Sequence, residues 1–482
     1  MSKNDSSFQI NKRSLLTAAI IIFALIVASY CLTLFLPPGA YERSADAEGD
    51  VSIVPGTYAQ TGEAGQYPVY NILLVIFKSF APGGSVNVIM ISIMLFILLI
   101  GGSFTLLDKS GILRAVVAKI AAKMYTRRYL LIAAVSFVFM FLGAFFGILE
   151  EIVPLIPLIV GLSFMLGWDS LMGLGLSLLS TSFGFAAALY NPFSIAIAQN
   201  LAGVPLYSGT WPRLIFFAVI YGLLVLFLTR YARKLDKNPM ASRVYAEDSE
   251  RRDKYRLTPA EIAEAAKFKR APMVFVGALL ALMFVFLVSA SFLGLADYSL
   301  IVIALIFILA SVGGAKLAGY KGAAKTFFKG IADIAPGIAL IPLAMSVSTL
   351  ISDSGIQDTI LFHCSSAISG ASPVAGVLII YAVVLLLEFF VAQASAKAFL
   401  LMPLLVPLAS LSGITGQTVV QAYVLGDGFL NVLYPTNAML LIALGLTTVS
   451  YPKWFRFTIG VQLIVMALSV GFLVLAVLGG YR

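Results

Sequence analysis

The chain has 482 residues, of which 60% are hydrophobic and only 11% are charged, and its mean hydropathy is +0.99. A soluble domain is about half apolar and about a quarter charged, so this composition indicates a protein that crosses a membrane several times. The net charge of +9 does not indicate nucleic-acid binding, because the basic residues lie in short stretches between apolar runs, where they set membrane topology.

The first predicted element is a membrane helix. The apolar run 15–36 follows Lys12 and Arg13, as the core of a signal peptide would. The run is long enough to span a bilayer, whereas the apolar cores of cleaved signals are shorter. We therefore expect an uncleaved first helix.

Charge sets the expected orientation of the chain. The segment 37–85 carries five acidic residues against one arginine and one lysine, so we expect it outside the cell. The stretches 108–128 and 230–270 are strongly basic and are expected in the cytoplasm. The second of them contains Thr258-Pro259-Ala260-Glu261, a capping box with proline at the first helical position, which predicts a short cytoplasmic helix.

The apolar runs predict nine crossings, with the N-terminus inside and the C-terminus outside. A further run, 70–81, is short and amphipathic, so it either lies on the surface or adds a re-entrant piece. The basic stretch 109–128, with apolar residues at helical spacing, predicts an interfacial helix. The nine crossings are 15–36, 86–107, 167–197, 211–228, 273–293, 300–311, 331–350, 414–441 and 455–478.

Two further apolar pairs are expected to form hairpins. The stretches 129–149 and 152–166 either both span the membrane or form one hairpin that turns at Gly147–Glu151. The stretch 374–410 would turn at Ala392–Lys397, where small residues suit a close-packed re-entrant tip that lines a cavity. We favour two hairpins, which places charged residues at membrane depth.

A weak internal repeat relates the two halves of the chain. Thr105-Leu106-Leu107 recurs as Thr349-Leu350-Ile351, and Gly184-Phe185 recurs as Gly428-Phe429, both 244 positions later. The segment 352–372 has no lysine or arginine, whereas its counterpart in the first half is basic. The two copies therefore face opposite ways, and an inverted repeat of this kind is typical of secondary transporters.

Two long helices are predicted to break at corresponding positions. The first reads Ser180 to Gly184 and then Tyr190-Asn191-Pro192, and the second reads Gly426-Asp427-Gly428 and then Tyr434-Pro435-Thr436-Asn437. Proline removes a helical hydrogen bond, and unwinding exposes carbonyl groups to cations and helix N-termini to carboxylates. An ordinary proline kink is the alternative. As residues that bind a coupling ion we assign Ser182, Gly184, Gln393 and Thr436.

Charged residues within the apolar zone are expensive and are therefore functional candidates. They are Glu150, Glu151, Glu388, Lys397 and Asp427, which make the zone net negative and favour binding of a cationic species. At an offset of 246, Glu151 corresponds to Lys397, so the two tips carry opposite charges. Lys397 either pairs structurally with Glu151, binds a substrate carboxylate, or acts as a built-in cation at an ion position.

Four stretches of the sequence carry a family resemblance: IGGSFTLLDKSGILRA, GILEEIVPLIPL, NPFSIAIAQNLAGVPLYSG and GDGFLNVLYPTN. They resemble the YfcC-like family, which groups with basic amino acid antiporters and DcuC-type C4-dicarboxylate carriers in the ion-transporter superfamily. The resemblance implies inverted repeats with opposed hairpins, a homodimer, and elevator-type alternating access driven by a cation gradient or by exchange. It also implies that the substrate is bordered by Glu150, Glu151, Asn191, Ser395, Lys397, Asp427 and Asn437. The second tip departs from the family pattern at Ala394, Ala396 and Lys397, where relatives carry a turn rich in glycine and serine.

Enzyme and channel functions are the rival classes. An intramembrane aspartyl protease needs Gly-x-Gly-Asp, but Val424 occupies the first glycine position before Asp427. Two cysteines and one histidine, His363, exclude a metalloprotease and zinc sites built on cysteine and histidine clusters. A channel is disfavoured because long broken helices with opposed hairpins suit a closed site rather than a pore.

We therefore predict an all-α polytopic membrane protein, an inverted-repeat transporter with two opposed re-entrant hairpins and two broken helices. Its cargo is a small carboxylate-bearing metabolite, preferably an amino acid, with a C4-dicarboxylate as the alternative. We expect no cofactor or metal centre, coupling to Na⁺ or H⁺, and a location in the cytoplasmic membrane of a bacterium. The expected regions are an N-terminal scaffold helix and loop (1–83), repeat 1 (84–229), a cytoplasmic linker (230–270), scaffold helices (271–330) and repeat 2 (331–482).

Overall fold

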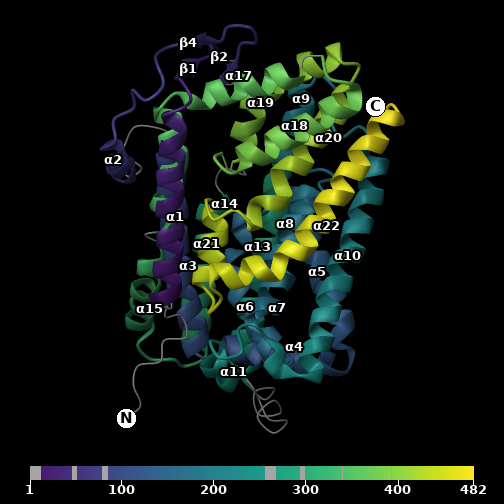
Figure 1. The fold of residues 1–482 in the computed structure, drawn as a ribbon. Coiled ribbons are helices and arrows are strands. Elements are labelled where there is room, and N and C mark those ends of the chain that lie inside the picture. Colours follow the sequence, from purple (N-terminus) through teal and green to yellow (C-terminus); the bar gives the residue numbers. More distant parts are fainter. Residues whose placement is uncertain are drawn as a thin grey trace.

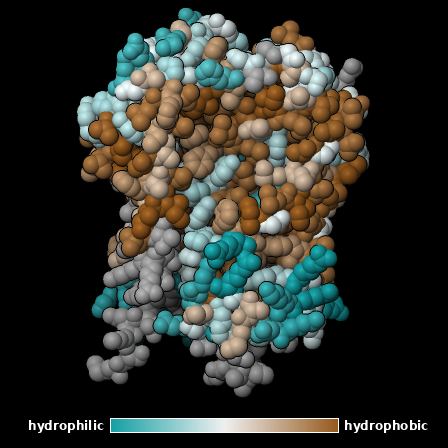
Figure 2. Space-filling model, in the orientation of Figure 1, coloured by the Kyte–Doolittle hydropathy of each residue, from teal (hydrophilic) through white to brown (hydrophobic). Residues whose placement is uncertain are grey.

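A helical bundle with an apolar belt between two polar ends is seen in the computed structural model of the chain (Figures 1 and 2). We name the ends after helices that lie there: the α11 end, with α4 (Ile112–Met124) and α11 (Ser249–Tyr255), and the α17 end, with α17 (Ile356–Ile368). The chain ends at the α17 end (Figure 1). The structure describes residues 12–45, 51–78, 85–255, 268–293, 299–338, 340–368, 370–391 and 393–481.

Among the described residues, four helices are long and apolar enough to cross a membrane: α5 (Arg128–Phe146), α10 (Thr210–Lys237), α19 (Ala394–Leu411) and α22 (Tyr451–Leu478). Large apolar side chains are exposed along these helices, as expected of a surface that faces lipid rather than water. The helix predicted to start at Thr258 lies outside the described residues.

The segment after α1 (Lys12–Thr33) corrects the expectation of a purely helical chain. It contains two small antiparallel sheets, in which β1 (Gly39–Ala40) pairs with β4 (Ala59–Gln60) and β2 (Arg43–Ala45) pairs with β3 (Val51–Ile53). Side-chain contacts with α17 hold this segment. The amide of Tyr41 donates a 2.9 Å hydrogen bond to Asp358, and the ring of Tyr58 stacks on Phe362 with centroids 4.2 Å apart.

The short run predicted at 70–81 forms α2 (Asn71–Lys78). Asn71 and Val75 are buried on one face, while Phe77 on the other face is 70% exposed. This helix therefore lies on the surface of the bundle, and Lys78 forms an ion pair of 2.8 Å with Asp353 at the end of α16.

The first half of the bundle contains the predicted interruption of the long apolar stretch 167–197. Where one continuous helix would give 31 residues of regular backbone, the structure has short helical pieces and two π-helical turns. In chain order the elements are α3 (Ser85–Lys109), α4, a 3₁₀ turn (Tyr125–Arg127), α5, a 3₁₀ turn (Glu150–Leu155), α6 (Ile156–Met165), α7 (Ser170–Leu174), a π turn (Gly175–Leu179), α8 (Ser180–Ala186), a π turn (Pro192–Ala196), α9 (Ile197–Leu201) and α10.

The second half also contains an interrupted helix, within the predicted span 414–441. The residues predicted to span the membrane at 331–350 belong to two described helices, α15, which packs along α3, and α16, which packs along α1, and residue 339 between them lies outside the described residues. The elements are α13 (Arg270–Leu293), α14 (Ser299–Leu317), α15 (Ala323–Ile338), α16 (Leu340–Asp353), α17, α18 (Pro373–Glu388), α19, α20 (Gly416–Gly428), a 3₁₀ turn (Phe429–Val432), α21 (Ala438–Gly445) and α22.

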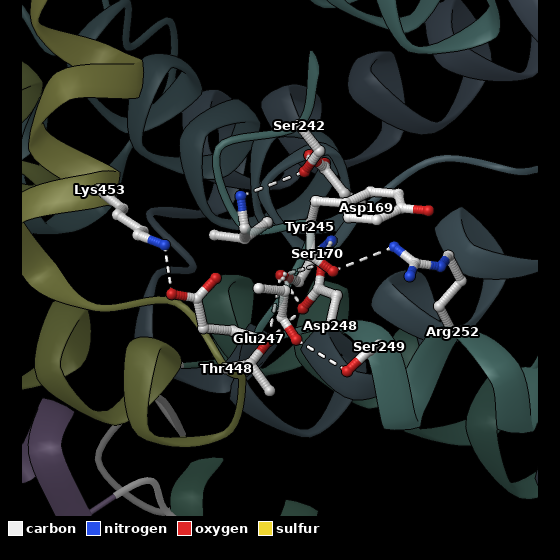
Figure 3. A network of polar contacts seen from close by, with 12 residues as sticks. Asp169, Ser170, Ser242, Tyr245, Glu247, Asp248, Ser249, Arg252, Thr448 and Lys453 are labelled. Carbon is white, nitrogen blue, oxygen red and sulfur yellow. Dashed lines mark hydrogen bonds and ion pairs between the residues drawn. The ribbon is translucent and has the colours of Figure 1, made fainter. Parts of the chain in front are cut away.

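A buried polar network at the α11 end joins the linker between the halves to both of them (Figure 3). Asp248 in the linker accepts hydrogen bonds from the amide of Ser170 at 2.9 Å, from its hydroxyl at 2.8 Å, and from the hydroxyl of Thr448. Asp169 caps α7 by accepting a 2.8 Å bond from the amide of Met172. Because Ser170 belongs to the first half and Thr448 to the second, Asp248 ties the two halves together.

The Asp169 carboxylate predicts a pH dependence of stability. Burial raises the pKa of Asp169 from 3.8 to about 6, although hydrogen bonds from Ser242 and Tyr231 oppose the shift. The folded state therefore holds this proton more tightly than the unfolded state, and the stability contributed by Asp169 is lost as pH rises from about 4 to about 6. Relative to Asp169→Asn, we expect the wild type to lose on the order of 3 kcal/mol over that range.

Thermal midpoints of the two purified proteins between pH 4 and pH 7 test this expectation. Other titrating groups are common to both proteins, so their difference isolates Asp169. A constant difference across the range would contradict the prediction.

Candidate functional site

Both interrupted helices resume at an asparagine that caps the new segment. After α8 ends at Ala186, Asn191 accepts hydrogen bonds from the amides of Phe193 at 2.9 Å and Ser194 at 3.3 Å. In the second half, Asn437 accepts a 3.0 Å bond from the amide of Met439. The breaks therefore lie where Pro192 and Pro435 predicted them, and asparagine side chains satisfy amides that an unbroken helix would have satisfied.

The two interrupted helices cross in close contact. The hydroxyl of Ser182 donates a 3.1 Å hydrogen bond to the carbonyl of Gly428. A Cβ on Gly184 would lie 1.9 Å from the carbonyl oxygen of Met140, and one on Gly428 would lie 2.4 Å from the Cα of Ala186. The structure thus gives Ser182, a predicted ion-binding residue, a contact at the crossing, and it packs Gly184, another of them, against Met140 of α5.

The first tip lies against the break in its own half. Gly147 ends α5 with a φ of 64°, and a Cβ there would lie 2.3 Å from Oδ1 of Asn191. Oε2 of Glu151 accepts a 3.1 Å hydrogen bond from the amide of Leu149, so the tip is closed by its own carboxylate. Glu150 and Glu151 are both half-buried.

The second tip reaches the break in the opposite half. The hydroxyl of Ser395 donates a 3.3 Å hydrogen bond to the carbonyl of Phe193, directly after Asn191. Tyr423 of α20 donates a hydrogen bond to the carbonyl of Ala394, which fixes the start of α19. Gln393, a predicted ion-binding residue, is exposed at this tip.

Lys397 does not pair with Glu151, which corrects one of the predicted roles. Its ammonium group contacts Oε2 of Glu388 and lies 2.7 Å from Oδ1 of Asp427. The pairing follows from position, because Lys397 lies in the first turn of α19 between the end of α18 and the end of α20. We call Glu388, Lys397 and Asp427 the charged triad.

A chain of amide side chains leads from the charged triad to the second break. Asn431 donates a 3.1 Å hydrogen bond to the carbonyl of Asp427, and Asn437 donates one of 2.7 Å to Oδ1 of Asn431. Sequence reasoning did not assign Asn431 or Tyr423 to the site. The position of Asn431 four residues after Asp427, on the same helical face, was the available signal.

Three buried side chains near the breaks keep polar atoms without a hydrogen-bond partner among the described residues. These atoms are Nδ2 of Asn191, Oγ of Ser194 and Oγ1 of Thr436. Buried polar groups are normally paired, so unpaired donors at a helix break mark places where a ligand can bind. Asn191 and Thr436 were predicted for the site, and Ser194 was not.

The close helix crossing generates a prediction about stability. Gly428→Ala is expected to lower the free energy of unfolding by about 1–3 kcal/mol, because the new methyl group meets backbone atoms of Ala186 that have no room to move. Gly460→Ala in α22 is the matched control, since no atom lies within 4 Å of its added Cβ. Thermal midpoints measure both effects, and equal midpoints for the two variants would refute the described packing.

The family model for DcuC, the C4-dicarboxylate anaerobic carrier, matches residues 16–478. A putative basic amino acid antiporter, YfcC of Escherichia coli K12, is 28% identical over 419 residues, which cover 82% of this chain and 81% of YfcC. An uncharacterized protein of Haemophilus influenzae is 26% identical over 415 residues, covering 84% of this chain and 77% of that protein.

Two solved structures are also similar at a low level. The YdaH transporter of Alcanivorax borkumensis aligns over 97% of this chain and 98% of its own, with 17% identity and a TM-score of 0.43. MtrF of Neisseria gonorrhoeae, described with a class of antimetabolite efflux pumps, aligns over 96% and 94%, with 15% identity and a TM-score of 0.39. The predicted relationship to YfcC and DcuC is confirmed by the family match: the chain is a membrane transporter, not an enzyme, and belongs to the DcuC family of C4-dicarboxylate anaerobic carriers.

Proposed function

We propose that the protein is a secondary active transporter of a small carboxylate-bearing metabolite, preferably an amino acid. The observation that carries the proposal is the meeting of both tips with one helix break. Gly147 of the first tip lies against Asn191, and Ser395 of the second tip bonds to Phe193. A ligand at this break would touch both halves of the chain, as alternating access requires.

The break after Asn191 supplies the features of a carboxylate site. The helical segment from Pro192 to Leu201 begins there, and the N-terminus of a helix favours negative charge. Nδ2 of Asn191 and Oγ of Ser194 add buried donors that have no partner among the described residues. A substrate carboxylate at this position would satisfy both donors.

The first tip supplies the opposite charge. Glu150 and Glu151 stand three and four residues after Gly147, whose position is next to Asn191, and their 3₁₀ turn packs on α21. The ammonium group of Lys397 forms ion pairs with Glu388 and Asp427, so it is not available to bind a second carboxylate group of the substrate. Acidic groups near a carboxylate site favour an amino acid, whose ammonium group they would bind, over a dicarboxylate.

The descriptions of the relatives support both candidate substrates, an amino acid and a C4-dicarboxylate. The printed description of YfcC as a putative basic amino acid antiporter agrees with the preferred substrate class. The description of the DcuC family as C4-dicarboxylate carriers supports the alternative.

An inverted repeat with two opposed re-entrant hairpins is part of the proposal. Asp169 and Thr415 cap α7 and α20 and are 246 positions apart, as are the caps Asn191 and Asn437. Asp169 belongs to the network at the α11 end, whereas Thr415 bonds to the carbonyl of Tyr481, next to the C-terminus at the α17 end. Equivalent caps at opposite ends support inversion.

The way this unit works in the membrane follows from the family resemblance. We propose elevator-type alternating access in a homodimer, in the cytoplasmic membrane of a bacterium. The basic α11 end would face the cytoplasm.

Ligand-induced stabilisation of the purified full-length chain tests the substrate class. Arginine, ornithine and neutral amino acids are compared with succinate and fumarate, each with and without sodium. A ligand that binds only the folded state raises the thermal midpoint, and we expect this from an amino acid. Stabilisation by succinate or fumarate alone would reverse the preference. In proteoliposomes, conductance without counterflow would refute a carrier.

Asn191→Asp tests the carboxylate site. Aspartate caps a helix as well as asparagine does, so folding is expected to persist. The donor is lost and a like charge faces the substrate, so we expect the half-saturating concentration to rise at least about tenfold, as for a lost hydrogen bond to a charged group. Asn238→Asp makes the same exchange at an exposed cap and is the control. An unchanged half-saturating concentration in Asn191→Asp would remove Asn191 from the site.

A further inference from the structure

We propose that the charged triad is a proton-binding site and that its proton is the coupling ion of transport. The second part of this inference rests on the proposed transport function, whereas proton binding by the triad stands on its own geometry. The coupling ion is thereby assigned to the second half of the chain, apart from the carboxylate site at Asn191.

Three elements bring the triad together. Glu388 is the last residue of α18, Lys397 lies in the first turn of α19, and Asp427 is the penultimate residue of α20. The ammonium of Lys397 lies between the two carboxylates and contacts one oxygen of each. The side chains are at most 1% exposed, so the triad is closed to water in this conformation.

The triad has one negative charge too many when all three groups are ionised. Two carboxylates share one ammonium, and within the described part of the chain none of the three forms another ion pair. Oε1 of Glu388 and Oδ2 of Asp427 are buried and have no hydrogen-bond donor among the described residues. An uncompensated buried charge is strongly unfavourable, so the closed triad requires one further positive charge.

A proton meets this requirement better than a metal cation does. Hard metal cations bind through several oxygen ligands at once, and the ammonium of Lys397 already occupies the position between the carboxylates. A second cation there would be repelled by the first at short range. A proton needs a single oxygen: it forms an O–H bond at Glu388 or Asp427, converts that carboxylate to a neutral acid, and leaves an ion pair with Lys397.

The surrounding elements bring few other titratable groups. α20 adds Tyr423, whose hydroxyl is bonded to Ala394, and α18 adds Tyr381. α17, which packs on α18 and α19, carries Asp358, His363 and Cys364, and Asp358 is paired with Arg43. α8 has none, and the charged residues of α22 are confined to its first turns. The two triad carboxylates are therefore the groups that would take up the proton.

The triad is connected to the second helix break. The carbonyl of Asp427 accepts from Asn431, Asn431 accepts from Asn437, and Asn437 caps α21 through Met439. Two hydrogen bonds therefore connect Asp427, whose charge would change on protonation, with Asn437 at the start of α21. Because α21 packs on the turn that carries Glu150 and Glu151, protonation and substrate binding share one connected structure.

Infrared spectroscopy of the full chain without substrate tests the proton site directly. In the difference spectrum between the wild type and Glu388→Gln, in which the band of Asp169 cancels, we expect the carbonyl band of a protonated, buried carboxyl group that disappears as pH rises. Glu388→Gln leaves a neutral pair of Lys397 and Asp427 and is expected to lack the band. Glu388→Asp keeps the carboxylate and is expected to retain it. Absence of the band from the wild type at every pH at which it is folded would overturn the proposal.

Proteoliposomes that contain a pH-sensitive dye test coupling, with arginine and succinate as separate probes. For the transported probe, we expect proton movement that is independent of sodium. In Glu388→Gln we expect this movement to fall to the level of protein-free liposomes while counterflow persists. Lys397→Gln leaves two carboxylates without an ammonium and is expected to change the ion dependence of transport.

These experiments distinguish a failure of proton coupling from a failure of the triad's role and from a failure of the proposed transport function. Flux driven by sodium without proton movement would overturn proton coupling. Unchanged proton movement in Glu388→Gln would remove the triad from it. If neither probe shows counterflow while the carboxyl band titrates and depends on Glu388, the proposed transport function fails and the proton site stands.

Discussion

The need to satisfy backbone groups inside an apolar bundle is the constraint on which this structure depends. A helix that breaks in the belt leaves amides and carbonyls without their helical partners, and lipid offers none. The chain answers with asparagine caps, Asn191 and Asn437, and with two tips that lie against the first break. Among the described residues, side-chain atoms of Asn191, Ser194 and Thr436 remain without a hydrogen-bond partner beside the breaks. The same breaks that threaten stability therefore define the site.

The charged triad follows from the same constraint applied to side chains. Separating a buried set of charges leaves one of them unpaired, which is strongly unfavourable. Glu388, Lys397 and Asp427 therefore hold α18, α19 and α20 in register as long as the three side chains are paired. That register positions Ala394 and Ser395 at the second tip, and Ser395 reaches the first break. The charge state of the triad and the geometry of the proposed carboxylate site are thus linked through the start of α19.

Local patterns could predict the elements, whereas side-chain partners depended on packing that the sequence does not display. Apolar run length predicted most of the long helices, and Pro192 and Pro435 predicted the breaks, because these signals act within one helix. The offset of 246 that aligns Lys397 with Glu151 suggested their pairing as one of three alternatives, and the structure instead pairs Lys397 with Glu388 and Asp427. Asn431 was missed because its role depends on a bend that brings it to Asn437. The strands near Arg43 are too short to leave an alternating pattern.

The two halves differ in the charged and polar residues that they carry at corresponding positions. At an offset of 246, Glu388 corresponds to Leu142 and Lys397 to Glu151. At the offset of 244 that aligns Gly428 with Gly184, Asp427 corresponds to Phe183, so the first half has no equivalent of the triad. The first half instead provides Asn191 and Ser194, whose donors have no partner among the described residues, whereas the amide of Asn437 is bonded to Asn431. The proposed repeat, in which one copy would bind the ligand and the other would hold the compensating charges, accounts for both differences. The two halves touch where Ser395 meets Phe193 and Ser182 meets Gly428, and proposed coupling between them would act through these contacts.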